Sequence, residues 1–200
     1  MQIINQYCEW VIPPPPNALE LLELCGRVAY KSEDRITLGS AEKFLKVILT
    51  RKHESVLEHV GATVRFATDR GVSHELVRHR IASFTQESTR YVNYEKRGMT
   101  FVVPVDIDTG SWQYTYWLNH MRDSEWRYNA LIDTGASPQF ARSVLPNSLK
   151  TEVVMTANLR EWLYILRLRT ARDAHPQMVD LMRRAVTMFK EAVPVLFDEF

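Results

Sequence analysis

The chain has 200 residues, of which 46% are hydrophobic and 24% charged, and these fractions are those of an ordinary globular protein. This length is enough for one domain with a buried core, or at most for two small ones. The formal net charge is only +1, so no strong overall field favours nucleic acid or an anionic membrane, and each basic cluster needs a local explanation.

Cysteine usage and the apolar pattern disfavour several classes of protein. The two cysteines, Cys8 and Cys25, are too few for a disulfide framework, and neither has the CxxC spacing of a metal site. The first residues lack a basic segment followed by an apolar run, so we expect no signal peptide. No apolar stretch approaches the roughly 18 residues of a membrane helix. We therefore expect a soluble, cytoplasmic protein.

The first half of the chain mixes helix and strand patterns. Four prolines at 13–16 predict a stiff extended connector, and a ligand for an SH3-type domain is the less favoured alternative. Helical periodicity then covers residues 17–32 and 40–52, with Asn17 and Ser40 as the expected N-caps. Further along, the pattern predicts a strand within 59–68, a short helix at 73–80 capped by Ser73, and a strand at 87–94.

The second half has clearer boundaries. A long amphipathic helix is expected between Ser111 and Gly135, and a short one is expected from Ser137, with Pro138 at its first position and Pro146 closing it. A strand at 148–157 and two closing helices at 158–170 and 176–193 follow. The chain shows no βαβα rhythm, and it contains neither GxGxxG nor GxxxxGK[ST]. We therefore predict an α+β fold, with an antiparallel sheet and long flanking helices, in a single domain spanning 1–200.

The segment "HESVLEH" at 53–59 has a metal-binding interpretation and a structural one. It is close to the HExxH motif of zinc proteases, but its two histidines, His53 and His59, are six positions apart. That spacing is about 240° around a helix, so they cannot share a ligand face. We favour a polar helix end that leads into a strand, and we predict no metal.

The segment "RHRIASFTQESTRY" at 78–91 concentrates cations, hydroxyls and amides. Guanidinium groups such as those of Arg78 and Arg80 suit phosphates and carboxylates. Taken alone, Arg78-His79-Arg80 is better explained by a solvated basic surface, and the second half is equally well explained by a hydrophilic strand edge. Because further arginines follow at 142, 160 and 169, the whole set predicts a site for one or two phosphorylated ligands.

The predicted helix at 158–170 has an unusual distribution of arginines. Asn158 and Glu161 have the spacing of an N-terminal capping box. At about 100° per residue, one side of the helix carries Asn158, Trp162, Ile165 and Arg169, and the opposite side carries Arg160, Tyr164 and Arg167. A surface helix normally has one polar face, so this pattern predicts a helix that lies between two sites or two subunits.

Together these motifs resemble those of the flavin-dependent thymidylate synthases. Arg78-His79-Arg80, seven residues and then Ser88 is similar to the family's RHRx7S signature. The upstream "HESVLEH" resembles the family's His-x-Ser/Thr-x-x-Glu-His segment. Downstream, "ARSVLP" at 141–146 resembles its Ala-Arg-x-x-Leu-Pro segment, and "NLREWLYILRLR" resembles its Asn-x-Arg…Arg helix. The segments also occur in the family's order.

The resemblance implies an activity and an assembly. FAD is reduced by NADPH, and a methylene group passes from methylenetetrahydrofolate to C5 of dUMP, which gives dTMP. Family members are homotetramers with flavin sites built from several subunits, which would explain the two-faced helix. Classical thymidylate synthases use a cysteine thiolate, whereas Cys8 and Cys25 lie outside the cationic clusters that would lower a thiol pKa.

The resemblance also implies roles for individual residues. The implied flavin set is Ser55, Glu58, Arg78, His79, Arg80, Gln86, Asn158, Arg160 and Tyr164. The implied nucleotide set is Glu75, Arg78, Gln86, Glu87, Ser88, Thr89, Arg90, Arg142 and Arg169. Arg169 would polarise the uracil by stabilising negative charge on the ring. Ser88 would bind the nucleotide without acting as a nucleophile, and His53 would line the neighbouring cleft with Glu58.

Two alternatives stay open at the level of the sequence. "RYVNYEKR" at 90–97 mixes aromatic and cationic residues, as modules that bind single-stranded nucleic acid do, but the net charge is close to zero and acidic residues are interspersed. The other alternative is a protein that binds flavin without turnover. The presence of Ser88, Arg90, Arg142 and Arg169 argues against it.

Overall fold

The computed structural model describes all residues 1–200, and they cluster into two compact units. Unit 1 comprises Met1–Tyr7, Phe66–Arg78 and Thr85–Val153, and unit 2 comprises Cys8–Arg65, His79–Phe84 and Val154–Phe200. Each unit is described by itself below.

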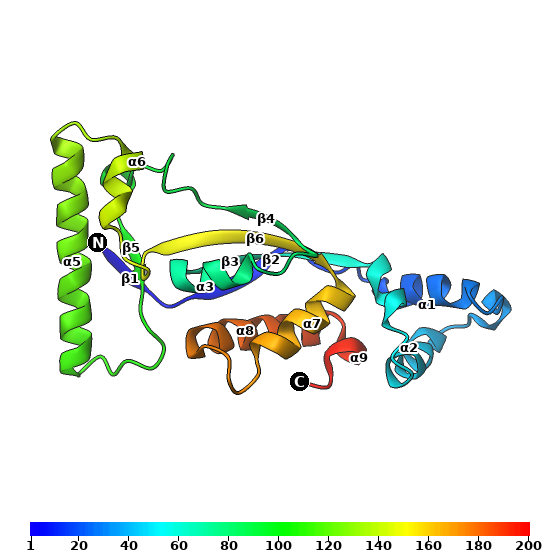
Figure 1. Cartoon of the computed structure of the whole chain (residues 1–200). Helices are drawn as coiled ribbons and strands as arrows, with labels where there is room; N and C mark the ends of the chain where they lie inside the picture. The colour runs from blue at the N-terminus through cyan, green and yellow to red at the C-terminus, as the bar shows by residue number, and fades with distance from the viewer. The chain divides into compact units, whose positions relative to one another are not determined.

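The main sheet has four strands in the order β2-β3-β6-β4. Their bounds are Tyr7–Ile12 for β2, Gly61–Asp69 for β3, Lys150–Asn158 for β6 and Ser83–Gln86 for β4. Neighbouring strands run in opposite directions (Figure 1). This antiparallel sheet, accompanied by helices, confirms the predicted α+β class. All four strands contribute residues to both units.

Unit 1 contains the small parallel pair of β1 (Gln2–Ile4) and β5 (Thr100–Val102), in the register Gln2↔Thr100. Its helices are α3 (Arg70–Leu76), α4 (Tyr94–Arg97), α5 (Trp112–Asp133), α6 (Pro138–Ala141) and the 3₁₀ turn η3 (Arg142–Val144). The long α5 packs along α6 (Figure 1). The core of this unit is built from Tyr94, Met99, Phe101, Met121, Tyr128, Ala141 and Leu149.

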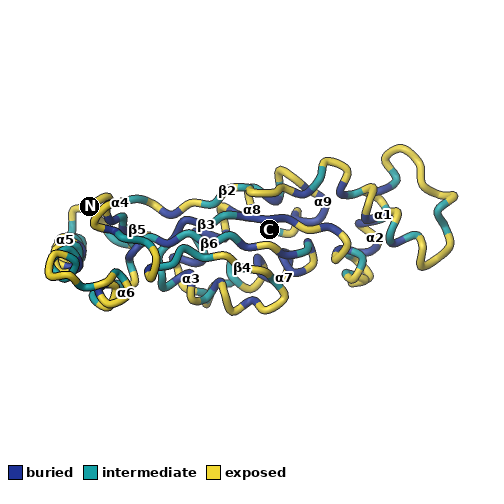
Figure 2. The backbone as a smooth tube through the Cα atoms, turned by 90° about the horizontal axis from the view of Figure 1, so that it is seen from above, coloured by how far each residue is buried: buried dark blue, intermediate teal, exposed yellow.

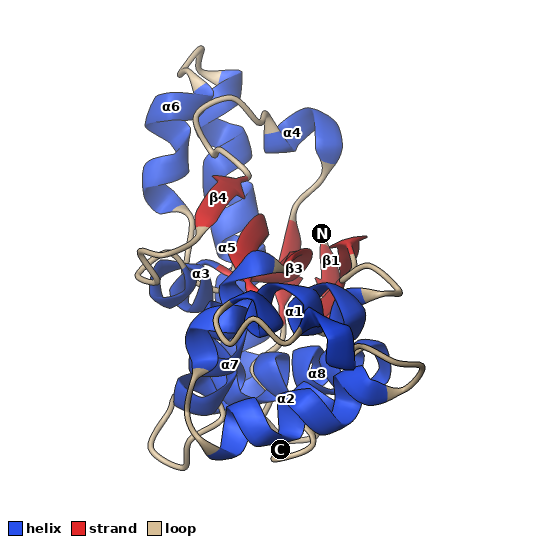
Figure 3. Cartoon of the chain, turned by 90° about the vertical axis from the view of Figure 1, so that its right-hand side faces the viewer, coloured by secondary structure: helices blue, strands red, loops and turns tan.

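Unit 2 is mainly helical. Its elements are α1 (Ala18–Val28), η1 (Glu33–Arg35), α2 (Ser40–Thr50), η2 (Glu54–His59), α7 (Leu159–Arg169), α8 (Pro176–Ala192) and α9 (Pro194–Phe197). Helix α1 packs on α2, and α7 packs on α8 (Figure 3). Between α7, α8 and α9 the rings of Trp162, Phe189 and Phe197 form the centre of the core, with centroids 4.8–5.0 Å apart.

Gly26 permits the close contact of α1 with α2, because a Cβ atom there would lie 2.7 Å from the ring of Phe44. The segment that links these two helices is exposed over most of its length (Figure 2). The proline run 13–16 is a connector, as predicted, and it joins α1 to the strand β2, which was not predicted; Pro14 is buried within it. No helix is long and apolar enough to cross a membrane.

Several predicted helix boundaries are confirmed by side-chain caps. Ser111 accepts a hydrogen bond from the Tyr114 backbone N–H at the start of α5, and Ser137 accepts one from Phe140 at the start of α6. Gly135 follows α5 with a φ of +90°. Asn17 occupies the N-cap position of α1, but its side chain makes no capping bond.

The predicted N-cap Ser40 is wrong by one residue. The N-cap of α2 is Gly39, whose φ of +75° favours glycine. Ser40 is the first helical residue, and its hydroxyl donates to Glu23 at 2.6 Å instead of accepting from the helix backbone.

The predicted short helix at 73–80 exists as α3, but its bounds and its cap are wrong, and the predicted strand at 87–94 is wrong. Helix α3 begins earlier because the carboxylate of Asp69 accepts from the Val72 N–H at 2.7 Å, and it ends at Leu76, before the RHR motif. After β4 the backbone turns, since the Ser88 carbonyl accepts from the N–H of Tyr91 at 3.1 Å. The alternation of side chains at 87–94 therefore does not reflect an extended backbone.

Candidate functional site

The RHR motif presents its three side chains differently. Arg78 and Arg80 are exposed, and their guanidinium groups make no ion pair. His79 between them is only 5% exposed. The motif begins just after α3 ends at Leu76, so the end of this helix determines where the motif lies. Exposed guanidinium groups without a carboxylate partner are available to an anionic ligand.

Within unit 2, His79 contacts Arg169 at the end of α7. The Arg169 Nε donates a hydrogen bond to His79 Nε2 at 3.0 Å. Burial and, to a smaller extent, the positive charge of Arg169 lower the pKa of His79 to about 4. The imidazole is therefore neutral at pH 7, with Nε2 as an acceptor and its proton on Nδ1. That nitrogen lies 3.9 Å from the carboxylate of Glu161.

The remaining residues of α7 separate into a buried face and an exposed face. Trp162 and Ile165 are fully buried, whereas Tyr164 is 54% exposed. Arg160 pairs with Glu58 of η2 at 2.5 Å, so two members of the predicted flavin set lie in direct contact. The side chain of Asn158 accepts from the Glu161 N–H at 2.8 Å, which confirms the predicted cap at the start of this helix.

A pocket of about 380 Å³ lies beside His53. The Tyr30 hydroxyl is 3.4 Å from His53 Nδ1 at its wall. Four cationic side chains line this pocket, and only one acidic side chain, that of Asp34, does so; the cations are Arg27, Lys31, Arg35 and Arg51. Arg27 is paired with Glu23, and Lys31 has a left-handed φ of +47°. Our sequence analysis missed this cationic pocket, although the clustering of basic residues at 27–35 and 51–52 was a usable signal.

In unit 1, the loop after β4 brings together four predicted nucleotide-binding residues. The Ser88 hydroxyl accepts from the Arg90 N–H at 3.3 Å. Thr89 is buried, and its hydroxyl accepts from Arg142 Nη1 at 3.3 Å. The Arg90 guanidinium lies over the ring of Tyr91 at 5.5 Å and is exposed. The loop thus presents two arginines and a serine hydroxyl at one place, a combination that suits a phosphate.

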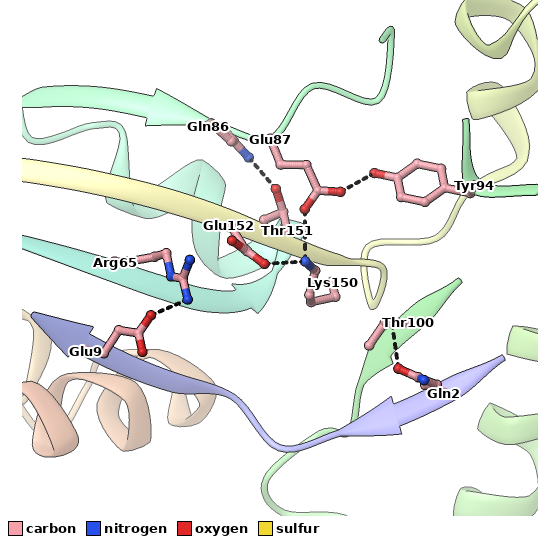
Figure 4. Close-up of polar contacts among 10 residues, drawn as sticks. All are labelled: Gln2, Glu9, Arg65, Gln86, Glu87, Tyr94, Thr100, Lys150, Thr151 and Glu152. Carbon is pink, nitrogen blue, oxygen red and sulfur yellow. Dashed lines mark hydrogen bonds and ion pairs between the residues drawn. The ribbon is translucent and has the colours of Figure 1, made fainter. Parts of the chain in front are cut away.

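Three other members of the predicted nucleotide set have partners inside the protein. The Gln86 amide donates to Ser73 at 2.9 Å and to Thr151 at 3.3 Å. Glu87 is bonded to Tyr94 and Lys150 (Figure 4). Glu75 lies half-buried on α3, and its carbonyl accepts from the Arg78 N–H. Their assignment to the nucleotide stays a prediction.

Comparison with known proteins places this chain in a family. The family model described as thymidylate synthase complementing protein matches residues 11–195. The chain belongs to this family. It is 32% identical to a flavin-dependent thymidylate synthase of Geobacter sulfurreducens, over 92% of this chain and 82% of the relative. A relative of the same name from Thermococcus onnurineus is 37% identical, over 82% and 70% of the two chains.

The fold agrees with that membership. A crystal structure of the UMP/dUMP methylase PolB from Streptomyces cacaoi, bound with 5-Br dUMP, has a TM-score of 0.83 and covers all of this chain and 96% of its own. Its sequence is 24% identical, so it supports the fold alone. The predicted membership of the flavin-dependent thymidylate synthases is confirmed, and so is the prediction of an enzyme of the methyltransferase class.

For this family member, the predicted site residues fall into two groups. Unit 1 holds Glu75, Arg78, Gln86, Glu87, Ser88, Thr89, Arg90 and Arg142. Unit 2 holds His53, Ser55, Glu58, His79, Arg80, Asn158, Arg160, Tyr164 and Arg169. Direct contacts link Arg142 with Thr89 in the first group, and His79 with Arg169 in the second. Ser55 is exposed on η2, and no group of three potential ligands forms a metal site.

Proposed function

We propose that this protein is a flavin-dependent thymidylate synthase that methylates C5 of dUMP. In the proposed reaction methylenetetrahydrofolate donates the carbon, and FAD, reduced by NADPH, supplies the hydride. The observation that carries the proposal is the match of the family model over residues 11–195, together with the RHR motif and the loop at Ser88. Several relatives named flavin-dependent thymidylate synthase, at 32% and 37% identity, support it further.

The donor set of unit 2 fits FAD. The cofactor carries a dianionic pyrophosphate, and Arg80 offers an exposed guanidinium without an ion pair. Tyr164 offers an exposed aromatic ring on α7. Arg160 and Asn158 add hydrogen-bond donors near the start of that helix. The cations beside His53 suit an anionic group of the cofactor or of a co-substrate.

The donor set of unit 1 fits the phosphate of dUMP. Arg90 and Arg142 offer guanidinium groups, and Ser88 offers a hydroxyl. We assign Ser88 to nucleotide binding and not to nucleophilic attack, since none of its observed contacts supplies a general base. The PolB neighbour, which was solved with 5-Br dUMP and 5-Br UMP, supports a nucleotide ligand for this fold.

Arg169 is the residue that we assign to activation of the uracil ring. A fixed cation stabilises negative charge that develops on the ring as C5 becomes nucleophilic. The hydrogen bond from Arg169 Nε to neutral His79 restrains the orientation of this guanidinium. Because His79 accepts that bond without a charge of its own, it restrains Arg169 without neutralising it.

The proposed chemistry needs no cysteine nucleophile, and the surroundings of Cys8 support this. Burial raises the pKa of the Cys8 thiol to about 12, and its Sγ lies 3.4 Å from Met188 Sδ. A thiol with such a pKa stays protonated at neutral pH, whereas nucleophilic attack requires the thiolate. We expect a Cys8→Ala, Cys25→Ala double variant to keep turnover in a tritium-release assay with labelled dUMP. A folded, flavin-loaded double variant without turnover would contradict the proposed mechanism.

Three further statements belong to the same proposal. We propose a homotetramer with shared active sites, a cytoplasmic location and a single domain over 1–200. Light scattering tests the homotetramer, because it should report four times the chain mass of 23.3 kDa. No nucleic-acid or membrane partner is proposed.

The deciding experiment is a visible absorbance spectrum of the purified protein, before and after addition of FAD. NADPH and then dUMP are added under anaerobic conditions. Flavin bands that bleach with NADPH, and faster with dUMP, support the proposal. An Arg127→Ala variant is the control, because Arg127 is an exposed arginine of α5 outside the predicted sets. The absence of a flavin band with added FAD would overturn the proposal and favour the nucleic-acid alternative.

A further inference from the structure

Glu87 joins Tyr94 and Lys150 in one hydrogen-bonded network at the base of the loop that carries Ser88 and Arg90 (Figure 4). The Tyr94 hydroxyl donates to Glu87 Oε1 at 2.8 Å. The Lys150 ammonium lies 3.1 Å from Glu87 Oε2 and 2.7 Å from Glu152. Each carboxylate oxygen of Glu87 therefore already has a partner within unit 1. These bonds compete directly with a contact between this carboxylate and a ligand.

The network is shielded from solvent. Tyr94 is 5% exposed, and the side chains of Glu87 and Lys150 are 16% and 20% exposed. Burial and the neighbouring Glu87 carboxylate raise the pKa of Tyr94, so its hydroxyl remains a donor at every physiological pH. Burial alone would lower the pKa of Lys150, but its bonds with Glu152 and Glu87 raise it overall. Lys150 thus stays charged and neutralises Glu87.

The same residues fix both ends of the loop. At one end, the Glu87 N–H donates to the carbonyl of Glu152 on β6 at 2.9 Å. At the other end, the Tyr94 N–H donates to the Tyr128 hydroxyl on α5 at 3.3 Å, and the two rings pack edge to face at 5.9 Å. The bond between Glu87 and Tyr94 joins these two ends across the six residues 88–93. It is therefore placed to restrain the conformation of the whole loop.

We propose that Glu87, Tyr94 and Lys150 are positioning residues, which hold residues 88–93 in the conformation that binds the nucleotide phosphate. This inference rests on the proposed function, and it gives Glu87 an indirect role in place of the direct contact that the family resemblance implies. Lys150 has a second effect, because an unpaired Glu87 carboxylate next to Ser88 would repel the phosphate. The network acts on nucleotide affinity, since none of its members touches the groups assigned to activation of the uracil.

The test is a KM-against-kcat comparison on flavin-loaded enzyme. Tyr94→Phe removes only the hydroxyl that closes the loop. We expect the KM for dUMP to rise about tenfold, the lower end of what the loss of a hydrogen bond to a charged group produces, while kcat and flavin absorbance stay at wild-type values. Tyr116→Phe is the matched control, because Tyr116 is 72% exposed on α5. An unchanged KM in Tyr94→Phe overturns the inference.

A double-mutant cycle separates an indirect role of Glu87 from direct binding. If Glu87 acts through Tyr94, the Glu87→Gln, Tyr94→Phe double variant loses less dUMP affinity than the two single variants together. Strictly additive losses overturn the inference. Lys150→Met should likewise raise the KM for dUMP, whereas Lys46→Met, which breaks an exposed pair with Glu42, should not. A wild-type holoenzyme that binds FAD but no dUMP would instead overturn the proposed function.

Discussion

Arg169 and Arg167 lie two positions apart on α7, and their guanidinium groups have different partners. Arg169 is hydrogen-bonded to His79 at 3.0 Å, whereas Arg167 pairs with Glu54 at 3.1 Å and with Glu199 at 2.7 Å. We predict that Arg169→Ala retains flavin but loses about 10²- to 10³-fold in kcat, because a preorganised charge near the uracil is removed. Tritium release from labelled dUMP, with flavin content read from absorbance, measures both effects.

Arg167→Ala is the control for that variant. This variant removes a guanidinium from the same helix. The exposed ion pairs of Arg167 that are lost stabilise the fold by only about 0–1 kcal/mol each. We expect this variant to keep a turnover close to that of the wild type. A wild-type rate in Arg169→Ala, or an equal loss in both variants, would remove Arg169 from the mechanism.

His79 gives a prediction about stability and pH. Its pKa is about 4 in the folded protein, against an ordinary value of 6.5 for a histidine side chain. As the pH falls from 6.5 to 4, the unfolded chain takes up a proton at this residue while the folded chain does not. The contribution of His79 to stability is therefore complete above pH 6.5 and is lost toward pH 4, and it amounts to at most about 3 kcal/mol.

Denaturant unfolding of the wild type and of His79→Gln, at pH 7 and at pH 4.5, measures that contribution. The groups that face the ring are Arg169, Glu161 and Tyr164, and all three remain in the variant. We expect the free energy of unfolding to fall less with pH in His79→Gln than in the wild type. Equal pH dependence in the two proteins would show that His79 is not held neutral.

The identity of these residues could be predicted from the sequence, but their contacts could not. His79 stands out because it belongs to the RHR motif, and Arg169 because it ends an arginine-bearing helix. Ninety positions separate them, and no local pattern indicates that one donates to the other. The same holds for Glu87, which the resemblance assigned to the nucleotide, because its partner Lys150 lies on a strand that follows much later in the chain.

At the scale of elements, capping residues made the boundaries predictable. Ser111, Ser137 and Asn158 precede apolar or aromatic periodicity, and each side chain accepts from a backbone N–H of its helix. The start of α3 was missed because two capping residues lie close together there. Asp69 lies four positions before Ser73, and its carboxylate begins α3 earlier than the sequence pattern suggested. Three-residue strands such as β1 and β5 are too short to give any periodic signal.

Variants of Asn158 can separate its role as the cap of α7 from its predicted role in flavin binding. As the N-cap of α7 its side-chain oxygen accepts from Glu161, and as a predicted flavin residue its amide could donate to the cofactor. Asn158→Ala should lower the free energy of unfolding by about 1 kcal/mol, whereas Asn158→Asp should preserve it because aspartate caps equally well. We expect both variants to bind FAD more weakly, as measured by titration of flavin fluorescence.

Ser111→Ala is the matched cap variant for that experiment, because it removes the cap of α5, which carries no predicted flavin residue. It should lose a similar amount of stability and keep the wild-type affinity for FAD. Wild-type affinity in Asn158→Asp would instead assign Asn158 to helix capping alone.

At the scale of the whole molecule, the predicted nucleotide set has members in both units. Ser88 and Arg142 belong to unit 1, and Arg169 belongs to unit 2. The antiparallel sheet was predicted from strand patterns at 59–68, 87–94 and 148–157, of which the first and the last form the strands β3 and β6. The proposed assembly of the chain into a tetramer has no comparable pattern in the sequence. The arginines on two faces of α7 are the sequence feature from which we inferred it, and a measurement on mixed subunits tests whether the active sites are shared.

Subunit mixing provides that measurement. Arg142→Ala and Arg169→Ala should each be nearly inactive alone, since each removes a cation from the nucleotide set. If Arg142 of one subunit and Arg169 of another serve the same active site, tetramers assembled from equal amounts of the two variants contain some sites with both arginines. Random assembly then restores about one quarter of the wild-type turnover, because each of the two arginines at a shared site is present with a probability of about one half. Sites confined to one chain would restore none, and such a result would contradict the proposal of shared active sites.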